Sequence, residues 1–353
     1  MEIKRRKTKT IKVGNVYIGG NYPVSIQSMA KTKTADVENT VRQIKELENA
    51  GCEIIRVAVK DSLDARAIKK IKPRINIPMV ADIHFNWRMA LEAIDNGADK
   101  IRLNPGNIYK KDEIREIVSA SKLARIPLRI GVNSGSVKSL NSKKLSMPDK
   151  LANSALDYIK ILEKFKFSDL VVSLKASNVT DTIEAYRKMA ELCDYPLHLG
   201  ITATGLPLQG AIKSGIAIGA LLLEGIGDTI RISLTDKPTE EVRVAKAILQ
   251  ALGLRNFGPE IISCPTCGRC AVDLIKIVNT LGNKLQASSS QLQTKPLKIA
   301  VMGCVVNGPG EASEADIGVA FGEKCGLLFK KGKSVRKVTF TNCTDILLKE
   351  IKG

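Results

Sequence analysis

The chain alternates short apolar runs with longer polar segments between residue 24 and residue 234. Each run is four to six residues long and rich in β-branched residues, which is typical of buried strands. The segments between the runs carry apolar residues at the spacing of an amphipathic helix. The eight runs are Val24–Met29, Ile54–Val59, Met79–Ile83, Ile101–Asn104, Leu128–Asn133, Leu170–Lys175, Leu197–Thr202 and Thr229–Leu234. Predicted helices include Val37–Ala50, Asn86–Asn96, Asp112–Leu123, Asp181–Leu192 and Gln209–Leu223.

This alternation predicts an α/β fold in which helices cover a parallel sheet. Eight strand–helix units in roughly 230 residues fit a (β/α)8 TIM barrel, and a doubly wound open sheet is the main alternative. A final helix over Glu240–Leu252 is followed by Gly253–Pro259, whose glycines and proline indicate a boundary. We therefore predict a barrel domain over residues 1–257 and a smaller α+β domain over residues 258–353.

The smaller domain has mixed helix and strand signals. Its spacing predicts a helix near Val272–Leu281 and strands near Leu297–Met302, Asp316–Phe321 and Ser334–Phe340. A polar stretch at Ser288–Gln293 is typical of a surface loop.

Cationic residues interrupt five of the predicted barrel strands. They are Arg56, Arg102, Arg129, Lys175 and Arg231. A buried cation is costly unless it is paired, and a structural salt bridge explains any one of these taken alone. Five cations on five strands of one barrel instead predict a site at the barrel mouth for a multiply charged anion. The planar fork of arginine suits phosphate oxygens.

Other polar residues end the same strands and extend this candidate site. They are Gln27, Ser28, Asp82, His84, Asn104, Asn133 and Ser233. We expect these side chains to bind substrate hydroxyls or to orient the arginines, and Asp82 and His84 stand where barrel enzymes keep catalytic groups. The other histidine, His198, is expected to be a structural hydrogen-bonding residue.

Composition narrows the class of protein. The formal charge is +19, but the lysines are spread over the whole chain and aromatic residues make up 4%, so few bases could stack. We therefore expect no nucleic-acid partner, and an acidic substrate or an acidic electron carrier would use the charge through steering. No run approaches the roughly 18 apolar residues of a membrane span, and no signal peptide is evident, so we expect a cytoplasmic protein without a membrane partner.

Six of the eight cysteines lie in the smaller domain, which points to metal or redox chemistry rather than a disulfide framework. Cys264 and Cys267 form a C-x-x-C pair, Cys304 follows 37 residues after Cys267, and Glu311 lies seven residues beyond Cys304. Zinc ribbons, dithiol enzymes and iron–sulfur proteins all use C-x-x-C. A zinc ribbon would need another Cys or His close to Cys304, and the sequence has none there. Spacing alone does not exclude Cys270, which extends the run to C-x2-C-x2-C.

Nearly the whole chain resembles the 4-hydroxy-3-methylbut-2-enyl diphosphate synthase family of the non-mevalonate isoprenoid pathway, in its two-domain bacterial form. The matching segments include Val24–Met29, Ala81–Phe85, Ile101–Gly106, Arg129–Asn133 and His198–Thr202. The most specific pair is Cys264–Arg269, which reads C-P-T-C-G-R, with Met302–Ala312, which reads M-G-C-V-V-N-G-P-G-E-A.

The resemblance implies a four-iron four-sulfur (4Fe-4S) cluster in the smaller domain, held by Cys264, Cys267, Cys304 and Glu311. It implies reduction of 2-C-methyl-D-erythritol 2,4-cyclodiphosphate, which is opened and dehydrated with two electrons from ferredoxin or flavodoxin. The diphosphate would lie among the strand cations, with Asp82, Asn104, Asn133 and Ser233 also lining the site. Glu311 would have a catalytic role, and the barrel of one subunit of a homodimer would meet the cluster domain of the other.

Two positions depart from the family pattern. Ala203 stands where relatives carry a glutamate after the seventh strand, and Cys270 stands where they carry another residue. Cys270 is either an alternative ligand after oxidative damage or a thiol without a role. A second hypothesis, from another class, is a zinc-stabilised phosphate-binding barrel whose C-terminal module recognises protein or nucleic acid.

Overall fold

The structure, a computed structural model, describes residues 3–137, 145–202, 204–287 and 296–352. The predicted loop Ser288–Gln293 and the departure at Ala203 lie outside these ranges. The chain divides into two compact units, residues 1–255 and 256–353, and each is described by itself. The predicted boundary after residue 257 lies two residues beyond this division.

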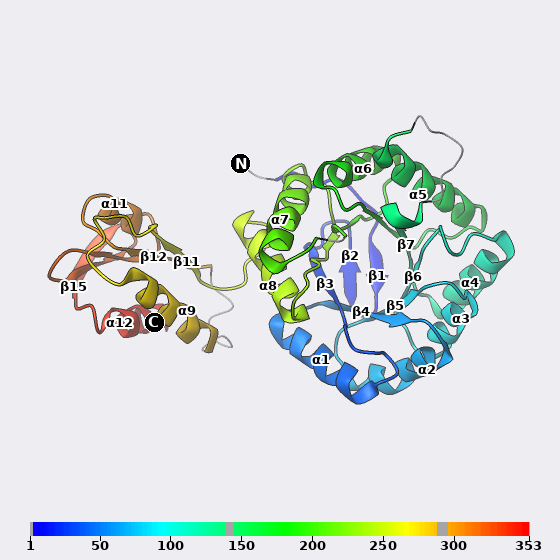
Figure 1. The fold of residues 1–353 in the computed structure, drawn as a ribbon, viewed down its shortest axis with the longest axis horizontal. Coiled ribbons are helices and arrows are strands. Elements are labelled where there is room, and N and C mark those ends of the chain that lie inside the picture. The colour runs from blue at the N-terminus through cyan, green and yellow to red at the C-terminus, as the bar shows by residue number, and fades with distance from the viewer. Residues whose placement is uncertain (1–2, 138–144, 203, 288–295, 353) are drawn as a thin grey trace. The chain divides into compact units, whose positions relative to one another are not determined.

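The first unit is a parallel eight-stranded barrel ringed by helices (Figure 1). Its strands are β3 (Ser25–Met29), β4 (Ile54–Val59), β5 (Met79–Ile83), β6 (Lys100–Leu103), β7 (Leu128–Asn133), β8 (Leu170–Lys175), β9 (His198–Leu199) and β10 (Thr229–Ile230). They pair in the order β8-β7-β6-β5-β4-β3-β10-β9. A parallel bridge between Val172 and Leu197 joins the two ends of this order, so the predicted TIM barrel is confirmed.

Eight α-helices of this unit cover the outside of the barrel among the described residues (Figure 1). They are α1 (Val37–Ala50), α2 (Ser62–Ile71), α3 (Arg88–Asp95), α4 (Lys111–Ala124), α5 (Met147–Lys164), α6 (Val179–Leu192), α7 (Pro207–Leu223) and α8 (Pro238–Ala251). Helix α1 shows why such segments begin and end where they do. The Asp36 side chain accepts a hydrogen bond from the Asn39 N–H at its start, and Gly51 adopts a left-handed φ of 99° at its end.

The last two barrel strands are shorter than the sequence predicts, because regular pairing covers only two residues in each. A Cβ atom on Gly200 would lie 2.8 Å from the Arg231 carbonyl oxygen and 2.8 Å from Lys175 Nζ. Position 200 therefore has no room for a side chain, and single hydrogen bonds such as Arg231 N–H to Leu199 O, at 3.0 Å, continue the contact beyond the ladder.

A β-hairpin that the sequence analysis did not predict packs against the amino-terminal ends of the barrel strands. It consists of β1 (Ile11–Val13) and β2 (Val16–Ile18), and Gly14 supplies the positive φ of its turn. Its buried side chains form one apolar cluster with Ile54, Val80 and Val171, which lie at or near the start of β4, β5 and β8. The hairpin therefore fills the end of the barrel opposite the predicted site (Figure 1).

The second unit is an α+β domain with a mixed five-stranded sheet. Its strands are β11 (Glu260–Ser263), β12 (Lys298–Met302), β13 (Ile317–Phe321), β14 (Gly326–Lys330) and β15 (Lys333–Val338), and its helices are α9 (Leu274–Ala287), α11 (Gly308–Ser313) and α12 (Cys343–Lys352). β11, β12 and β13 are parallel, whereas β14 and β15 are antiparallel. The predicted helix and the three predicted strands are present with shifted ends. β11, β14, α11 and α12 were not predicted.

Candidate functional site

Side chains on alternate strand positions point to the same face, so every second residue of a barrel strand points inward. In this barrel the inward positions near the carboxyl ends of the strands are mostly polar or charged. They enclose a cavity of about 160 Å³. Its lining consists of Arg56, Asp82, Arg102, Arg129, Gly131, Asn133, Ser173, Lys175, Ile201, Thr202 and Arg231.

The structure brings seven of the twelve barrel residues proposed from sequence to the lining of this cavity, and five do not line it: Gln27, Ser28, His84, Asn104 and Ser233. Asn104 is buried and holds loops together, because its amide nitrogen donates to Ser136 Oγ at 3.0 Å and its oxygen accepts from the Gly106 N–H at 3.1 Å. Ser233 contacts Thr204 through its backbone, because its carbonyl oxygen accepts a hydrogen bond from Thr204 Oγ1. These contacts give Asn104 and Ser233 supporting positions next to the cavity.

Strand register explains which lining residues meet. Asp82 pairs with Arg102 across β5 and β6, Arg102 with Arg129 across β6 and β7, and Asn133 with Lys175 across β7 and β8. Gly131 and Ser173 are also partners. Sequence analysis missed Gly131, Ser173 and Thr202, although the two-residue period back from Asn133 and Lys175 points to the first two.

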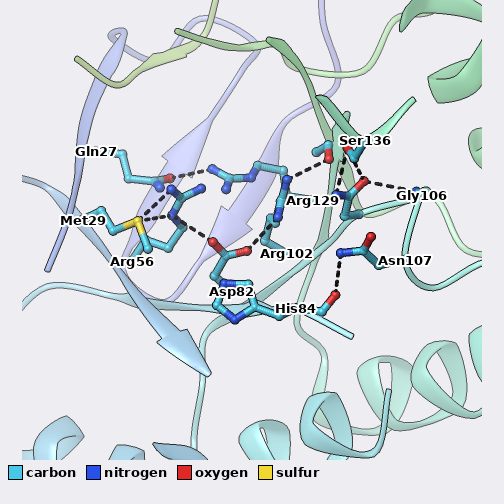
Figure 2. A network of polar contacts seen from close by, with 12 residues as sticks. Gln27, Met29, Arg56, Asp82, His84, Arg102, Gly106, Asn107, Arg129 and Ser136 are labelled. Atoms are coloured by element: carbon cyan, nitrogen blue, oxygen red, sulfur yellow. Dashed lines mark hydrogen bonds and ion pairs between the residues drawn. The ribbon is translucent and has the colours of Figure 1, made fainter. Parts of the chain in front are cut away.

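Asp82 is the centre of the polar network (Figure 2). Its Oδ1 accepts from Arg102 Nη1 at 3.0 Å, and its Oδ2 lies 3.6 Å from Arg56 Nε. Burial raises the pKa of this carboxyl, but the guanidinium groups of Arg56 and Arg102 lower it further, so the pKa lies below its ordinary value. Asp82 is therefore a permanent anion that orients two cations.

The remaining partners of these arginines are neutral (Figure 2). Arg56 donates to Met29 Sδ from Nη2 at 2.7 Å and from Nε at 3.2 Å, and Arg129 donates to Gln27 Oε1 at 3.4 Å. Arg102 Nη2 donates to the Gly131 carbonyl oxygen at 2.8 Å. Thioether sulfur is a weak acceptor and neutral oxygens cancel no charge, so the cations keep most of their field.

The cavity therefore carries an excess of positive charge, with five cations facing one carboxylate. Lys175 Nζ and the Nε atoms of Arg129 and Arg231 have no hydrogen-bond partner among the described residues. Burial, followed by the charge of Arg102, lowers the pKa of Arg129 to about 9, and burial together with Arg231 lowers the pKa of Lys175 well below its ordinary value. An anion with several oxygens would supply the missing partners.

Two further basic side chains lie fully buried in the barrel, Lys100 and His198. Both ring nitrogens of His198 lack a hydrogen-bond partner among the described residues, so its side chain does not show the hydrogen-bonding role expected from sequence. Burial and the charge of Arg129 lower the pKa values of both groups well below their ordinary values. The uncharged forms of Lys100 and His198 are thus favoured, because the barrel already holds many cations.

The second unit contains a separate cavity of about 170 Å³ lined by cysteines. All four ligands suggested by the family resemblance line it: Cys264, Cys267, Cys304 and Glu311. Cys264 follows β11, Cys304 follows β12, and Glu311 lies in the first turn of α11. The loops after two neighbouring parallel strands thus meet, as expected where parallel strands end at one edge of a sheet.

This donor set fits an iron–sulfur cluster. Thiolates are the ligands of such clusters, and the backbone N–H groups of Asn307 and Val306 lower the pKa of the Cys304 thiol. Among the residues that the structure describes, no three Cys, His, Asp or Glu side chains surround a point closely enough to hold a single ion. The four donors line one cavity.

Comparison with known proteins gives a consistent assignment along the chain. Residues 8–246 match the model of the GcpE TIM-barrel domain, and residues 260–353 match the GcpE protein C-terminal domain. The chain belongs to the GcpE family.

Full-length relatives of this GcpE-family chain are named 4-hydroxy-3-methylbut-2-en-1-yl diphosphate synthase (flavodoxin). The one from Caldanaerobacter subterraneus is 55% identical, with 99% of this chain and 98% of the relative covered. The one from Clostridium perfringens is 52% identical, with 99% of each covered. Among solved structures, dihydropteroate synthase from Yersinia pestis shares the fold, with a TM-score of 0.51 and 12% identity over 69% of this chain and 98% of its own.

These matches support the enzyme hypothesis for this GcpE-family chain, and the zinc-stabilised recognition protein gains no comparable support. Among the described residues, no helix is long and apolar enough to cross a membrane.

Gly131→Ala should weaken anion binding at the barrel cavity about tenfold, which corresponds to about 1.4 kcal/mol. A Cβ atom at position 131 would lie 2.3 Å from Arg102 Nε, and Asp82 and the Gly131 carbonyl hold that guanidinium in place. Sulfate binding measured by calorimetry checks this. Gly135→Ala is the matched control, because a Cβ atom there meets nothing within 4 Å. Equal binding by both variants would contradict the placement of Arg102.

Sulfate affinity should also fall severalfold as the pH rises from about 7 to about 10. Sulfate remains a dianion over this range and arginine keeps its proton, whereas burial and Arg231 lower the pKa of Lys175, so that Lys175 loses its proton as the pH rises. A bound anion favours the charged forms, so binding is full at low pH and requires proton uptake at high pH. Calorimetry in buffers of different ionisation enthalpy measures that uptake. Lys175→Arg should flatten the pH dependence, because arginine keeps its proton. A wild-type affinity that stays constant over this pH range would show that Lys175 does not lose its proton.

Proposed function

We propose that this chain reduces 2-C-methyl-D-erythritol 2,4-cyclodiphosphate to 4-hydroxy-3-methylbut-2-enyl diphosphate in the non-mevalonate isoprenoid pathway. Flavodoxin is the electron donor, as in the names of its relatives. The observation that carries this proposal is the barrel cavity with its five cations and one carboxylate. A cyclic diphosphate offers several anionic oxygens to such a cavity.

The barrel residues bind and orient the diphosphate. Lys175 and Arg231 have donor atoms without partners and supply charge-assisted hydrogen bonds to phosphate oxygens. Arg56, Arg102 and Arg129 add guanidinium groups that Asp82 and Gln27 already hold in position. Because these contacts exist before the anion arrives, binding requires little rearrangement of the arginines.

Asp82 and Asn133 act as positioning residues for the cations. Asp82 bridges Arg56 and Arg102, and Asn133, with its amide turned to satisfy both ends, accepts from Arg102 Nη2 at 3.3 Å. Ser173 and Thr202 place hydroxyl groups on the cavity wall, where they suit the substrate hydroxyls. The cations thus bind the diphosphate, and the carbon skeleton of the substrate lies toward the cavity opening.

The second unit supplies the redox centre, a 4Fe-4S cluster held by Cys264, Cys267, Cys304 and Glu311. When bound, the cluster delivers the two electrons and polarises a substrate oxygen while the C–O bonds break. Glu311 and Cys267 are exposed, whereas Cys264 and Cys304 are partly buried. Glu311 would be the one hard oxygen donor among three soft thiolates, and so the ligand most easily exchanged.

The active unit is a homodimer in which the barrel of one subunit meets the cluster domain of its partner. Helix α7 offers a surface for pairing, because Leu208, Ile212 and Ile216 recur every four residues on one face and are 69%, 52% and 54% exposed. Contiguous exposed apolar residues of this size mark interaction surfaces. A second copy of the chain, packing α7 against its counterpart, would cover this face.

Glu311→Gln should retain about four irons per chain and lower kcat by about a hundredfold or more, equivalent to about 2.7 kcal/mol. The amide keeps the size of the side chain but is a weak iron ligand without charge. Conversion of the cyclodiphosphate with dithionite as reductant, together with iron analysis, measures both effects. Glu314→Gln is the matched control, because Glu314 lies one helical turn further and does not line the cavity. Full turnover by Glu311→Gln would refute the role of Glu311, and an inactive wild-type protein would refute the reaction.

Ile212→Asp combined with Ile216→Lys should convert the dimer to a monomer, because charged groups would then be buried in the interface. Analytical ultracentrifugation measures the mass, and circular dichroism checks that the barrel is folded. Lys213→Asp, on the same helix but outside the stripe, is the control. A double variant that remains dimeric would place the interface elsewhere.

A further inference from the structure

Cys270 is a fifth side chain of metal-ligating type at the cysteine cavity. It lines the same cavity as Cys264, Cys267, Cys304 and Glu311. Among the described residues, the remaining cysteines do not line this cavity: Cys52, Cys193, Cys325 and Cys343. The cavity where a cluster would be held therefore contains one thiol more than the assigned ligand set requires.

Gly303 shows how near Cys270 is to the assigned ligands. A Cβ atom built on Gly303 would lie 2.3 Å from Cys270 Sγ and 3.5 Å from Cys264 Sγ. The two sulfurs are consequently within about 6 Å of each other, because the two distances to the same point add to at most 5.8 Å. Gly303 also directly precedes Cys304, so Cys270 Sγ packs over the backbone between two ligand positions.

The backbone around Cys270 is held in place. Its N–H donates to the Cys267 carbonyl at 2.9 Å, and the next N–H, of Ala271, donates to the Gly303 carbonyl at 2.8 Å. The side chain is partly buried against the apolar core of the domain, as is that of Cys264, and its thiol donates to the Val272 carbonyl at 3.3 Å. A change of rotamer about the Cα–Cβ bond would release this weak hydrogen bond and free the thiol.

We propose that Cys270 is a reserve thiolate ligand, which binds the cluster iron in place of Cys264 when Cys264 cannot supply a thiolate. This inference rests on the cluster of the proposed function. Cys264, Cys267 and Cys270 have the C-x2-C-x2-C spacing with which ferredoxins place three cysteines on one cluster. In the exchange the bond between iron and the Cys264 sulfur would break, and Cys270 would lose its thiol proton to solvent and form the new iron–sulfur bond, so no electron is gained or lost.

Cys264 is the ligand that Cys270 replaces, because these two sulfurs share the contact with Gly303 and both pack on the same apolar core. Cys267 is exposed on the loop, and Glu311 is exposed on α11, so neither shares this buried position. Oxidation of a ligand thiolate to a sulfinate is the event in which such a reserve would retain the cluster.

The test compares full-length variants after anaerobic cluster assembly, with iron, sulfide and absorbance near 400 nm as readouts that do not depend on turnover. Cys264→Ala should keep more than about half of the wild-type iron, and Cys270→Ala alone should keep all of it. The double variant of Cys264→Ala with Cys270→Ala should keep less than about a tenth. The matched control joins Cys264→Ala with Cys325→Ala, which removes the same number of thiols and should behave like Cys264→Ala.

Two outcomes would overturn the proposal. One is a Cys264→Ala variant as poor in iron as its double variant with Cys270→Ala, and the other is an equal loss in the control with Cys325→Ala. Cys264→Val, which fills more of the space left by the sulfur, repeats the comparison if alanine impairs folding, and thermal melting of each variant checks this. A wild-type protein that assembles no cluster would instead count against the proposed function.

Discussion

The barrel encloses like charges that its own carboxylate cannot neutralise, and the arrangement of the first unit depends on this constraint. Strand register places Arg102 beside Arg129, and Asp82 beside Arg102, so one anion pairs with two cations, and among the described residues the cavity lining offers no second carboxylate to the other three. Burying a charge without a partner is expensive, and the lowered pKa values of Arg129 and Lys175 express that cost. An anion bound among these cations would relieve this cost, which would turn a cost in stability into affinity for the anion.

The second unit presents its soft thiolate ligands in loops rather than in a deep pocket. Its sheet is parallel only over β11, β12 and β13, and the cysteine loops follow two of these strands, where their ends meet at one edge. The apolar core beneath supports Cys264 and Cys270, while Cys267 and Glu311 remain exposed. Support on one side and exposure on the other suit a redox group that must contact both a protein donor and a substrate.

The sequence predicted the parts of this protein that follow from periodicity, and missed those that follow from contact. Arg56, Arg129 and Lys175 were recognised because a charge inside an apolar run conflicts with its surroundings. Asn104 and Ser233 were proposed as polar residues at the ends of the same strands, yet loop contacts, visible only in three dimensions, hold them outside the cavity lining. The hairpin at Ile11–Ile18 was missed because its strands are only three residues long, too short for a clear period. The nearness of Cys270 to Gly303 likewise depends on a contact across 33 residues of chain.

The hairpin also determines how molecules move through the barrel. Ile11, Val13 and Ile18 seal the amino-terminal end with buried apolar side chains, so the cavity is a well with one opening. Incoming substrate and outgoing product must use that opening in turn, and both carry a diphosphate that the same cations attract. On the proposed function, the product would have to leave before each new turnover, and the cations that attract the substrate, Lys175 among them, would also slow that departure.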